Sequence, residues 1–421
     1  MDHAHDSHDH AHDDHHELGF WRKWVFSTDH KIIGLQYGVT GLIFLMFGFG
    51  LMMLMRWTIA HADTPIPFGG GILNMVMGDE MVSKAGLISS NAYNVFGAMH
   101  GTIMVFFGIV PVAFAAFGNY VMPLQIGAVD MTFPRLNMAS FWSFFISCVI
   151  MVVSFFVPGG AAKSGWTSYS PLAGLADSNL AYGSPDYFHL IMNGQTLWII
   201  GMVFNITASL LGSVNFIATI VQLRAPGMTW MRMPFFCWAI FITAYLLLLA
   251  FPPLEAAAIM QLMDRVAGTS FFMPTGLVVN GHPAPFSGGG SPLLWQHLFW
   301  FLAHPEVYVL ILPALGMITE IIACNTRKPI WGYKAMVGAI FTLAFLSFIV
   351  WAHHMYMTGM GAKVAGFFQV TTIMISVPSA GRSTCGGTSR YIDPPSGGAS
   401  DQRDEALLPG PRGTTLLGGG P

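Results

Sequence analysis

The hydrophobic pattern of the chain predicts a bundle of membrane-spanning helices. Seven apolar segments, each long enough to cross a hydrocarbon layer of about 30 Å as a helix, alternate with short polar stretches. The segments cover residues 31–56, 92–122, 137–157, 188–223, 232–262, 292–322 and 333–357. An eighth begins at Val364 and ends at Ala380 after about 17 residues. We therefore expect an all-α fold, a polytopic transmembrane helix bundle in which about seven helices are complete.

The two ends of the chain depart from this pattern and divide it into three parts. Residues 1–19 are rich in His and Asp, with seven histidines; we expect a disordered tail, and copper or zinc binding is the alternative. Residues 20–380 form the expected membrane domain. After Ala380 the pattern stops in mid-helix, and residues 381–421 hold ten Gly and five Pro, which is typical of unstructured sequence. We interpret this break as a frameshift, real or from a sequencing error.

Composition and charge agree with a membrane protein. The chain is 53% hydrophobic and only 9% charged. Its net charge of -3 gives no reason to expect nucleic acid as a partner. Lipid and other membrane subunits are the expected partners.

The basic residues predict the orientation of the bundle. The side that holds the N-terminus carries nine of them: Arg22, Lys23, Lys31, Arg135, Arg224, Arg232, Arg327, Lys328 and Lys334. The other side carries five: Arg56, Lys84, Lys163, Arg265 and Lys363. Basic loops stay on the cytoplasmic side, so we expect a cytoplasmic N-terminus, and without a transit peptide we expect the inner membrane of a bacterium.

Four histidines inside apolar segments are the main candidates for chemistry. With a rise of about 1.5 Å per helical residue, His100, His304, His353 and His354 all fall in the outer half of the membrane. Tyr308 is four positions after His304 and lies on the same helix face. Three neutral imidazoles from two helices suit copper. The alternative is that each histidine is a polar group bonded to a neighbouring carbonyl.

Several motifs resemble subunit I of the haem-copper terminal oxidases of the cytochrome c oxidase type, A family. They occur in the same order along most of residues 20–380. The motifs are STDHK (27–31), MHG (99–101), NYVMPLQIGAVDMTFPRLN (119–137), GWT (165–167), DR and GT (264–269), WQHLFW (295–300), HPEVY (304–308), RKP (327–329) and WAHHMY (351–356).

This resemblance implies the metal ligands. His304, His353 and His354 are expected to bind copper-B, and His100 to be an axial ligand of the low-spin haem. Tyr308 is expected to be cross-linked to His304 and to supply an electron and a proton during O–O cleavage. The implied cofactors are two haems, expected to be of the a type, and copper.

The resemblance also implies a proton path and contacts to haem. Glu306 is expected to be the internal proton donor. Asp130 is expected to take up protons from the cytoplasm, although the residue by itself is typical of a solvated loop. Other polar residues of the expected path are Asn119, Asn137, Ser209 and Asn215.

Three further residues match positions near haem in the family: Arg56, Trp166 and Tyr169. Arg56 has an alternative interpretation as a helix-end arginine that extends to the membrane interface. Glu255 lies within a membrane segment, after Pro252 and Pro253. It matches no residue of known role in the family, and either an accessory proton site or a capped polar group accounts for it.

The implied function is that of the catalytic subunit of a terminal oxidase. It would reduce O2 to water with electrons from cytochrome c, coupled to proton pumping, together with a copper-bearing subunit II and subunit III. Family members normally have twelve helices. The proximal histidine of the high-spin haem and the second axial histidine of the low-spin haem lie beyond the match. The alternative is therefore a non-catalytic fragment unable to hold both haems. Nitric oxide reductase is disfavoured by Tyr308, and quinol oxidase by the apolar second helix.

Overall fold

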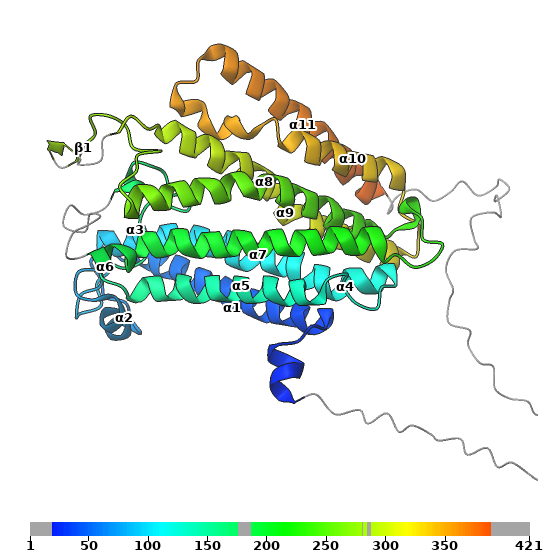
Figure 1. Ribbon diagram of the computed structural model, residues 1–421, viewed down its shortest axis with the longest axis horizontal. Coiled ribbons are helices and arrows are strands. Elements are labelled where there is room, and N and C mark those ends of the chain that lie inside the picture. Colours follow the sequence, from blue (N-terminus) through cyan, green and yellow to red (C-terminus); the bar gives the residue numbers. More distant parts are fainter. Residues whose placement is uncertain (1–18, 176–186, 280, 284–287, 389–421) are drawn as a thin grey trace, which may run out of the picture.

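The computed structural model describes residues 19–175, 187–279, 281–283 and 288–388, which form a bundle of long helices running side by side (Figure 1). The long elements are α1 (His30–Ala60), α3 (Ser90–Thr102), α4 (Phe117–Ile126), α5 (Pro134–Val153), α7 (Gly194–Gln222), α8 (Phe235–Val266), α9 (Pro292–Thr326), α10 (Tyr333–Ser347) and α11 (Ala362–Thr388).

Shorter elements lie within or between these helices. The short α-helices and the π-helical turns are α2 (Gly70–Met77), α6 (Tyr187–Ile191), η1 (Trp21–Val25), η2 (Ile103–Ile109) and η3 (Pro111–Ala116). The 3₁₀ turns are η4 (Ser154–Phe156), η5 (Leu172–Gly174), η7 (Trp230–Arg232) and η8 (Trp351–Thr358). One small antiparallel pair joins β1 (Val278–Val279) to β2 (His282–Pro283).

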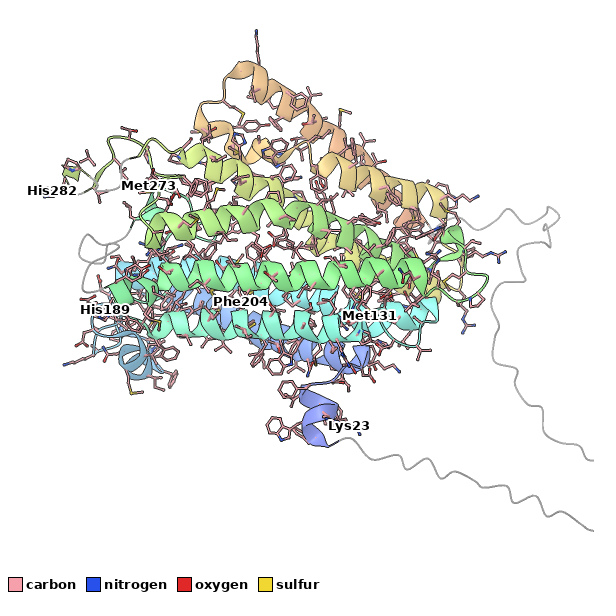
Figure 2. The ribbon with its side chains drawn as sticks, viewed as in Figure 1. Lys23, Met131, His189, Phe204, Met273 and His282 are labelled. Atoms are coloured by element: carbon pink, nitrogen blue, oxygen red, sulfur yellow. The ribbon has the colours of Figure 1, made fainter. Side chains whose placement is uncertain are left out.

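Seven helical segments of the described chain are long and apolar enough to cross a membrane, which confirms the predicted polytopic bundle. They are His30–Ala60, Ser90–Ile126, Pro134–Phe156, Gly194–Gln222, Phe235–Val266, Pro292–Thr326 and Tyr333–Thr358. The chain is therefore a multi-pass membrane protein. Figure 2 shows the two ends of the bundle: Lys23 and Met131 lie toward one end, and His189 and His282 toward the other.

Local signals in the sequence explain where several spans begin. The Asp29 side chain caps α1 by accepting a hydrogen bond from the Lys31 amide, and the Asn193 side chain caps α7 in the same way. Pro134 and Pro292 occupy the first positions of α5 and α9, where a missing N–H costs nothing. The cap at Asn193 also separates α6 from α7, so the predicted segment 188–223 is divided near its start.

Small residues let α1 approach the second span closely. A methyl group added at Gly34 would lie 3.0 Å from the Ala116 carbonyl oxygen, and one added at Gly41 would lie 2.7 Å from a Val112 methyl group. Gly48 continues the same face seven residues later. The close approach brings the backbone of α1 within hydrogen-bonding distance of side chains on the second span.

The last helix differs from the sequence prediction. α11 continues to Thr388, whereas the apolar pattern predicted its end at Ala380. Extending an existing helix adds one backbone hydrogen bond per residue at low cost, so residues of low helix propensity can follow an apolar stretch. The expected unstructured tail beyond Thr388 and the His-rich residues 1–18 lie outside the described part of the chain.

Asp264 and Arg265, at the end of α8, hold two different loops. The Asp264 carboxylate accepts hydrogen bonds from the Thr269 hydroxyl (2.6 Å) and from two backbone amides, at Phe271 and Phe272. The Arg265 guanidinium is 4% exposed and donates to the carbonyl oxygens of residues 173 and 175 and to two side chains. Arg265 is thus a buried structural group and does not count as a loop charge in the orientation argument.

We predict that Asp264→Ala lowers the stability of the purified protein. The change leaves the amides of Phe271 and Phe272 without their acceptor, which should cost about 2–4 kcal/mol. A fall in the thermal unfolding midpoint in detergent measures the effect. Asp264→Asn keeps an acceptor oxygen and should lose less; equal midpoints for the wild type and Asp264→Ala would contradict the prediction.

Candidate metal centre

Three histidines meet where α9 lies against η8. His304 comes from α9, and His353 and His354 come from η8; one ring nitrogen of each lies within 4.8 Å of the other two. His304 Nδ1 is 3.2 Å from His354 Nε2, and His353 Nε2 is 3.1 Å from the same atom. Nitrogens bound to one ion at about 2.0 Å lie about 3–3.5 Å apart. The spacing therefore fits three ligands of a single metal ion.

A neighbouring hydroxyl determines which nitrogen of His353 can bind a metal. The Thr372 hydroxyl on α11 donates to the Phe368 carbonyl oxygen (2.6 Å), so toward His353 Nδ1, 2.9 Å away, it acts as the acceptor. His353 Nδ1 therefore carries the hydrogen, and its Nε2 lone pair faces His354. A cation between such lone pairs removes their repulsion, and bonding of the outer nitrogen is the usual support of a metal-ligating imidazole.

His304 and Tyr308 are neighbours, as their spacing predicted. Their ring centroids are 5.3 Å apart, in an edge-to-face arrangement. His304 Nε2, the nitrogen that is not in the triad, is buried and makes no hydrogen bond within the described chain. α9 continues through Pro305 without interruption. His304 thus has Nδ1 available for the metal and Nε2 without a hydrogen-bond partner in the described chain.

An aromatic side chain, Trp300, packs against the triad. The Trp300 ring stacks on the His354 ring, with centroids 3.9 Å apart and planes at 12°. Its indole N–H donates to the Tyr169 hydroxyl at 2.5 Å. Burial raises the pKa of the Tyr169 phenol, and the bond from Trp300 opposes that shift. Tyr169 thus remains a neutral phenol at physiological pH and contacts the metal centre through one intermediate ring.

His100 lies on α3, outside the triad. Its Nδ1 donates to the Gly48 carbonyl oxygen on α1 at 2.9 Å. The lone pair of Nε2 is therefore available to bind iron. Trp166 packs over Gly101, next to His100, and meets Trp300 edge-on at 5.8 Å. Trp166 therefore lies between the His100 turn and the triad.

Arg56 is exposed in the last turns of α1. This position fits both earlier interpretations, a contact to a haem substituent and a helix-end arginine at the interface.

Glu306 is the most isolated carboxyl group of the described chain. It is 2% exposed, and both of its oxygens are buried without a hydrogen-bond partner among the described residues. Ionising a carboxyl group in such surroundings costs several kcal/mol in lost hydration. The group is therefore suited to carry a proton as a neutral acid.

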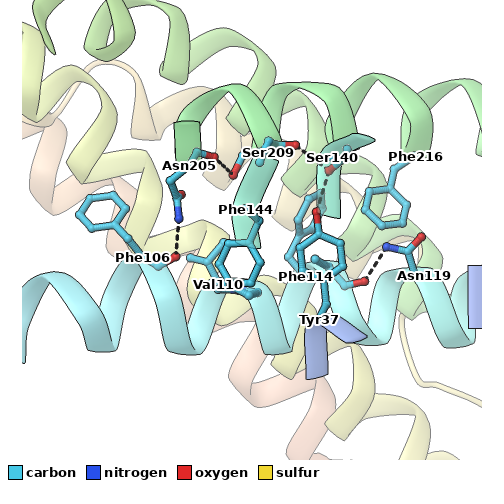
Figure 3. A pocket seen from close by; sticks show the side chains of 14 residues that line it. Tyr37, Phe106, Val110, Phe114, Asn119, Ser140, Phe144, Asn205, Ser209 and Phe216 are labelled. Carbon is cyan, nitrogen blue, oxygen red and sulfur yellow. Dashed lines mark hydrogen bonds between the residues drawn. The ribbon is translucent and has the colours of Figure 1, made fainter. Parts of the chain in front are cut away.

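A small cavity lies between α1, the second span, α5 and α7 (Figure 3). Its polar lining residues are Tyr37, Asn119, Ser140, Asn205 and Ser209. The Tyr37 hydroxyl is 2.7 Å from Ser140 Oγ, and Ser209 Oγ donates to the Asn205 carbonyl oxygen. Glu306 is not among the lining residues. A cavity with several polar partners can hold water, which proton transfer requires.

Asn119 and Asn137 lie together at the end of the cavity nearer the N-terminal side of the bundle. The Asn137 side-chain amide donates to Asn119 Oδ1 at 2.6 Å, and each residue is 1% exposed. His30 Nδ1 donates to the Asn119 backbone carbonyl oxygen at 2.6 Å. The two asparagines thus form one buried polar pair that links the second span to α5.

Asn215 occupies a different place from the one expected. Its side chain bonds both the amide nitrogen and the carbonyl oxygen of Phe133, at 2.9 and 3.3 Å, and it does not line the cavity. Thr219 accepts from the amide of Thr132 in the same loop. These contacts fix the loop that carries Asp130, which is half-buried. Asn215 thus holds the loop that carries Asp130.

Sequence reasoning missed three residues of the cavity, although helical spacing could have indicated them. Asn205 precedes Ser209 by four positions, Ser140 follows Asn137 by three, and Tyr37 follows His30 by seven. Each spacing places the missed residue on the helix face of a polar residue already singled out.

Glu255 is half-buried between α7 and α8. Its Oε1 accepts a hydrogen bond from the Thr207 hydroxyl at 2.6 Å. Thr207 is two positions from both Asn205 and Ser209, so it lies away from the cavity face of α7. Glu255 and the cavity therefore lie on different faces of α7. This contact favours a capped polar group over an accessory proton site for Glu255.

Comparison with known proteins identifies the family of this chain. Residues 32–395 match the family described as cytochrome c and quinol oxidase polypeptide I, which extends past Ala380, where we expected the resemblance to end. The alternative cytochrome c oxidase subunit 1 of Bradyrhizobium diazoefficiens is 40% identical over 365 residues, covering 87% of this chain and 56% of the relative. Cytochrome c oxidase subunit 1 of Synechocystis is 40% identical over 362 residues, covering 85% and 57%.

A third relative is the probable cytochrome c oxidase subunit 1-alpha of Streptomyces coelicolor, 42% identical over 357 residues and covering 85% of this chain and 53% of the relative. The chain thus spans about half the length of the curated relatives it matches. The family match covers most of the chain, including every residue of the triad. This chain belongs to the cytochrome c and quinol oxidase polypeptide I family.

Proposed function

We propose that this chain is the catalytic subunit of a terminal respiratory oxidase that reduces O2 to water and couples the reaction to proton pumping. The observation that carries the proposal is the triad of His304, His353 and His354, with Tyr308 beside it. The relatives named as cytochrome c oxidase subunits support cytochrome c as the electron donor. The term subunit 1 in their names implies further subunits, and we propose a subunit II with a copper centre and subunit III as partners.

The residues present can supply three ligands to copper and one axial ligand to a haem iron. The triad offers three neutral imidazole nitrogens at ligand spacing, and His353 is bonded at its outer nitrogen by Thr372. His100 presents a free Nε2. When bound, haem iron and copper supply the electron transfer that O2 reduction requires.

The protein side of the reaction is the supply of protons and the exclusion of water. In this proposal Asp130 takes up protons at the end of the bundle that holds the N-terminus, and the Asn119–Asn137 pair orients the water that would carry them toward the cavity. Glu306 then holds a proton on its carboxyl group, within a region closed to solvent. The Tyr308 phenol donates a proton next to His304. Trp166 and Tyr169 position the aromatic wall, and Arg56 contacts a haem substituent in the same proposal.

The orientation follows from the same basic residues as before. With Arg265 buried, the side away from the N-terminus retains four loop charges, so the bias toward the N-terminal side is stronger. We propose a cytoplasmic N-terminus in a bacterial inner membrane and haems of the a type.

The test is purification of the protein with its membrane partners from its host. We expect copper in the preparation, a dithionite-reduced spectrum with haem bands, and O2 uptake with reduced cytochrome c. A folded preparation without copper would overturn the proposed metal centre. O2 uptake with quinol in place of cytochrome c would overturn the proposed donor.

A further inference from the structure

We propose that two buried glutamines, Gln195 on α7 and Gln261 on α8, are positioning residues for the metal centre. Neither residue reaches the triad. They hold the loop of residues 164–170, and this loop is connected to His354 by a continuous series of contacts. The inference rests on the proposed copper site.

The two glutamines and the loop form a closed hydrogen-bond network. Gln261 Nε2 donates to the Ser168 carbonyl oxygen (2.9 Å) and to Ser170 Oγ (3.1 Å), and Gln261 Oε1 accepts from Ser168 Oγ (3.0 Å). Gln195 Nε2 donates to Ser168 Oγ (2.9 Å), and Gln195 Oε1 accepts from Ser164 Oγ (2.9 Å). Every donor and acceptor has a consistent role, so both side-chain amides have one fixed orientation.

The loop backbone requires this support. Ser168 has a φ of 49°, in the left-handed region that side chains other than glycine rarely adopt. Ser168 is also fully buried, at 0% exposure. Surrounding contacts must hold such a residue in place, and Gln261 bonds both its backbone and its side chain. The conformation of Ser168 determines the direction of the next residue, Tyr169.

The route continues from Tyr169 to the metal centre in two contacts. The Tyr169 hydroxyl accepts the Trp300 indole N–H, and the Trp300 ring stacks on His354 at 3.9 Å and 12°. A parallel ring at this distance restricts the tilt of the imidazole. The lone pair of His354 Nε2 lies in the ring plane, so the tilt determines whether it points at the ion.

A second contact ties the same loop to α9. The Trp295 indole N–H donates to the Thr167 carbonyl oxygen at 2.9 Å. The loop is therefore held from α7 and α8 by the two glutamines and from α9 by Trp295. Loss of the glutamine contacts would leave the loop attached to α9 but free to rotate Ser168, and the effect should reach the triad through Tyr169.

The experiment uses Gln261→Leu and Tyr169→Phe, singly and together, in the assembled oxidase. The readouts are the triad copper retained against a competing chelator and the X-ray absorption spectrum of that copper, each taken as the difference from His304→Ala, which keeps only the copper of subunit II. Thermal stability is measured separately. Thr207→Val is the matched control, because it removes an interhelical hydrogen bond, to Glu255, on the other face of α7.

We expect Gln261→Leu to lower copper affinity roughly 10–100-fold, the usual effect of losing support for a metal ligand. The double variant should bind copper as tightly as the weaker-binding single variant, because both changes break the same route. Thr207→Val should lower thermal stability and leave copper affinity within about twofold, as for a site without contact to the ligands.

Gln261→Leu with lower thermal stability but unchanged copper affinity and spectrum would overturn the inference, as would additive losses in the double variant. Should Gln261→Leu fail to fold, Gln195→Leu takes its place with the same expected results. The proposed function fails separately, if the wild-type protein holds no copper or if His304→Ala leaves its copper unchanged.

Discussion

Replacing His304 with alanine should lower the copper content of the assembled oxidase by the ion of the triad, leaving the copper of subunit II in place, and should abolish O2 reduction. His304 Nδ1 is one of three nitrogens that converge at 3.1–3.2 Å contacts, and two imidazoles alone leave the ion poorly held. Changes to residues that merely support metal ligands typically cost about 10–100-fold, so loss of a ligand should cost at least about 100-fold in activity. Copper content and O2 uptake with reduced cytochrome c measure the two effects.

His189→Ala is the matched control for this change. His189, which Figure 2 labels, is an exposed histidine on α6 at one end of the bundle. It lies outside the membrane-spanning helices. The control should keep both its copper and its activity. Equal copper contents in His304→Ala and His189→Ala would refute the assignment of the triad as the copper site.

Glu306→Gln should stop turnover while leaving the metal centre intact. Glutamine has the size of glutamate but carries no transferable carboxyl proton, and Glu306 has no hydrogen-bond partner in the described chain that the amide would disturb. Positioned proton transfer typically contributes about 10²- to 10⁴-fold to a rate, and we expect a loss of that order in O2 uptake. Copper content and the reduced haem spectrum should stay unchanged.

Glu255→Gln is the control for Glu306, because it is a second carboxyl group within a membrane span. Its partner Thr207 can bond an amide oxygen as well as a carboxylate oxygen, so activity should be retained. Normal turnover in Glu306→Gln, or an equal loss in Glu255→Gln, would contradict the proposed role of Glu306 as proton donor.

The proton path illustrates how much of the site the sequence could predict. Asn119 and Asn137 were expected as polar residues of the path near Asp130, and their side chains bond each other at 2.6 Å. Asn215 was expected to line the path, but its amide is bonded to the backbone of Phe133. Both residues are polar positions on apolar helices, and only the rotation of each helix against its neighbours decides whether such a side chain meets a cavity or a loop.

The orientation argument changed for a similar reason. Arg265 follows Asp264 at a helix end, and a sequence pattern treats it as a loop charge. In the fold it is buried and bonded to loop carbonyl oxygens, because the loop of residues 172–175 returns over the end of α8. A charge count cannot include such a contact between residues about 90 positions apart.

The sequence by itself determined the class of this protein, the number of its complete spans and the identity of the three triad histidines. Span length, hydropathy and depth along a helix are local properties, so the apolar pattern carries them. Only the tertiary structure decided which nitrogen of each histidine faces the others, which residues line the cavity, and how Gln261 connects to His354. These depend on side-chain rotamers and helix rotations, which are set by packing against neighbours distant in sequence.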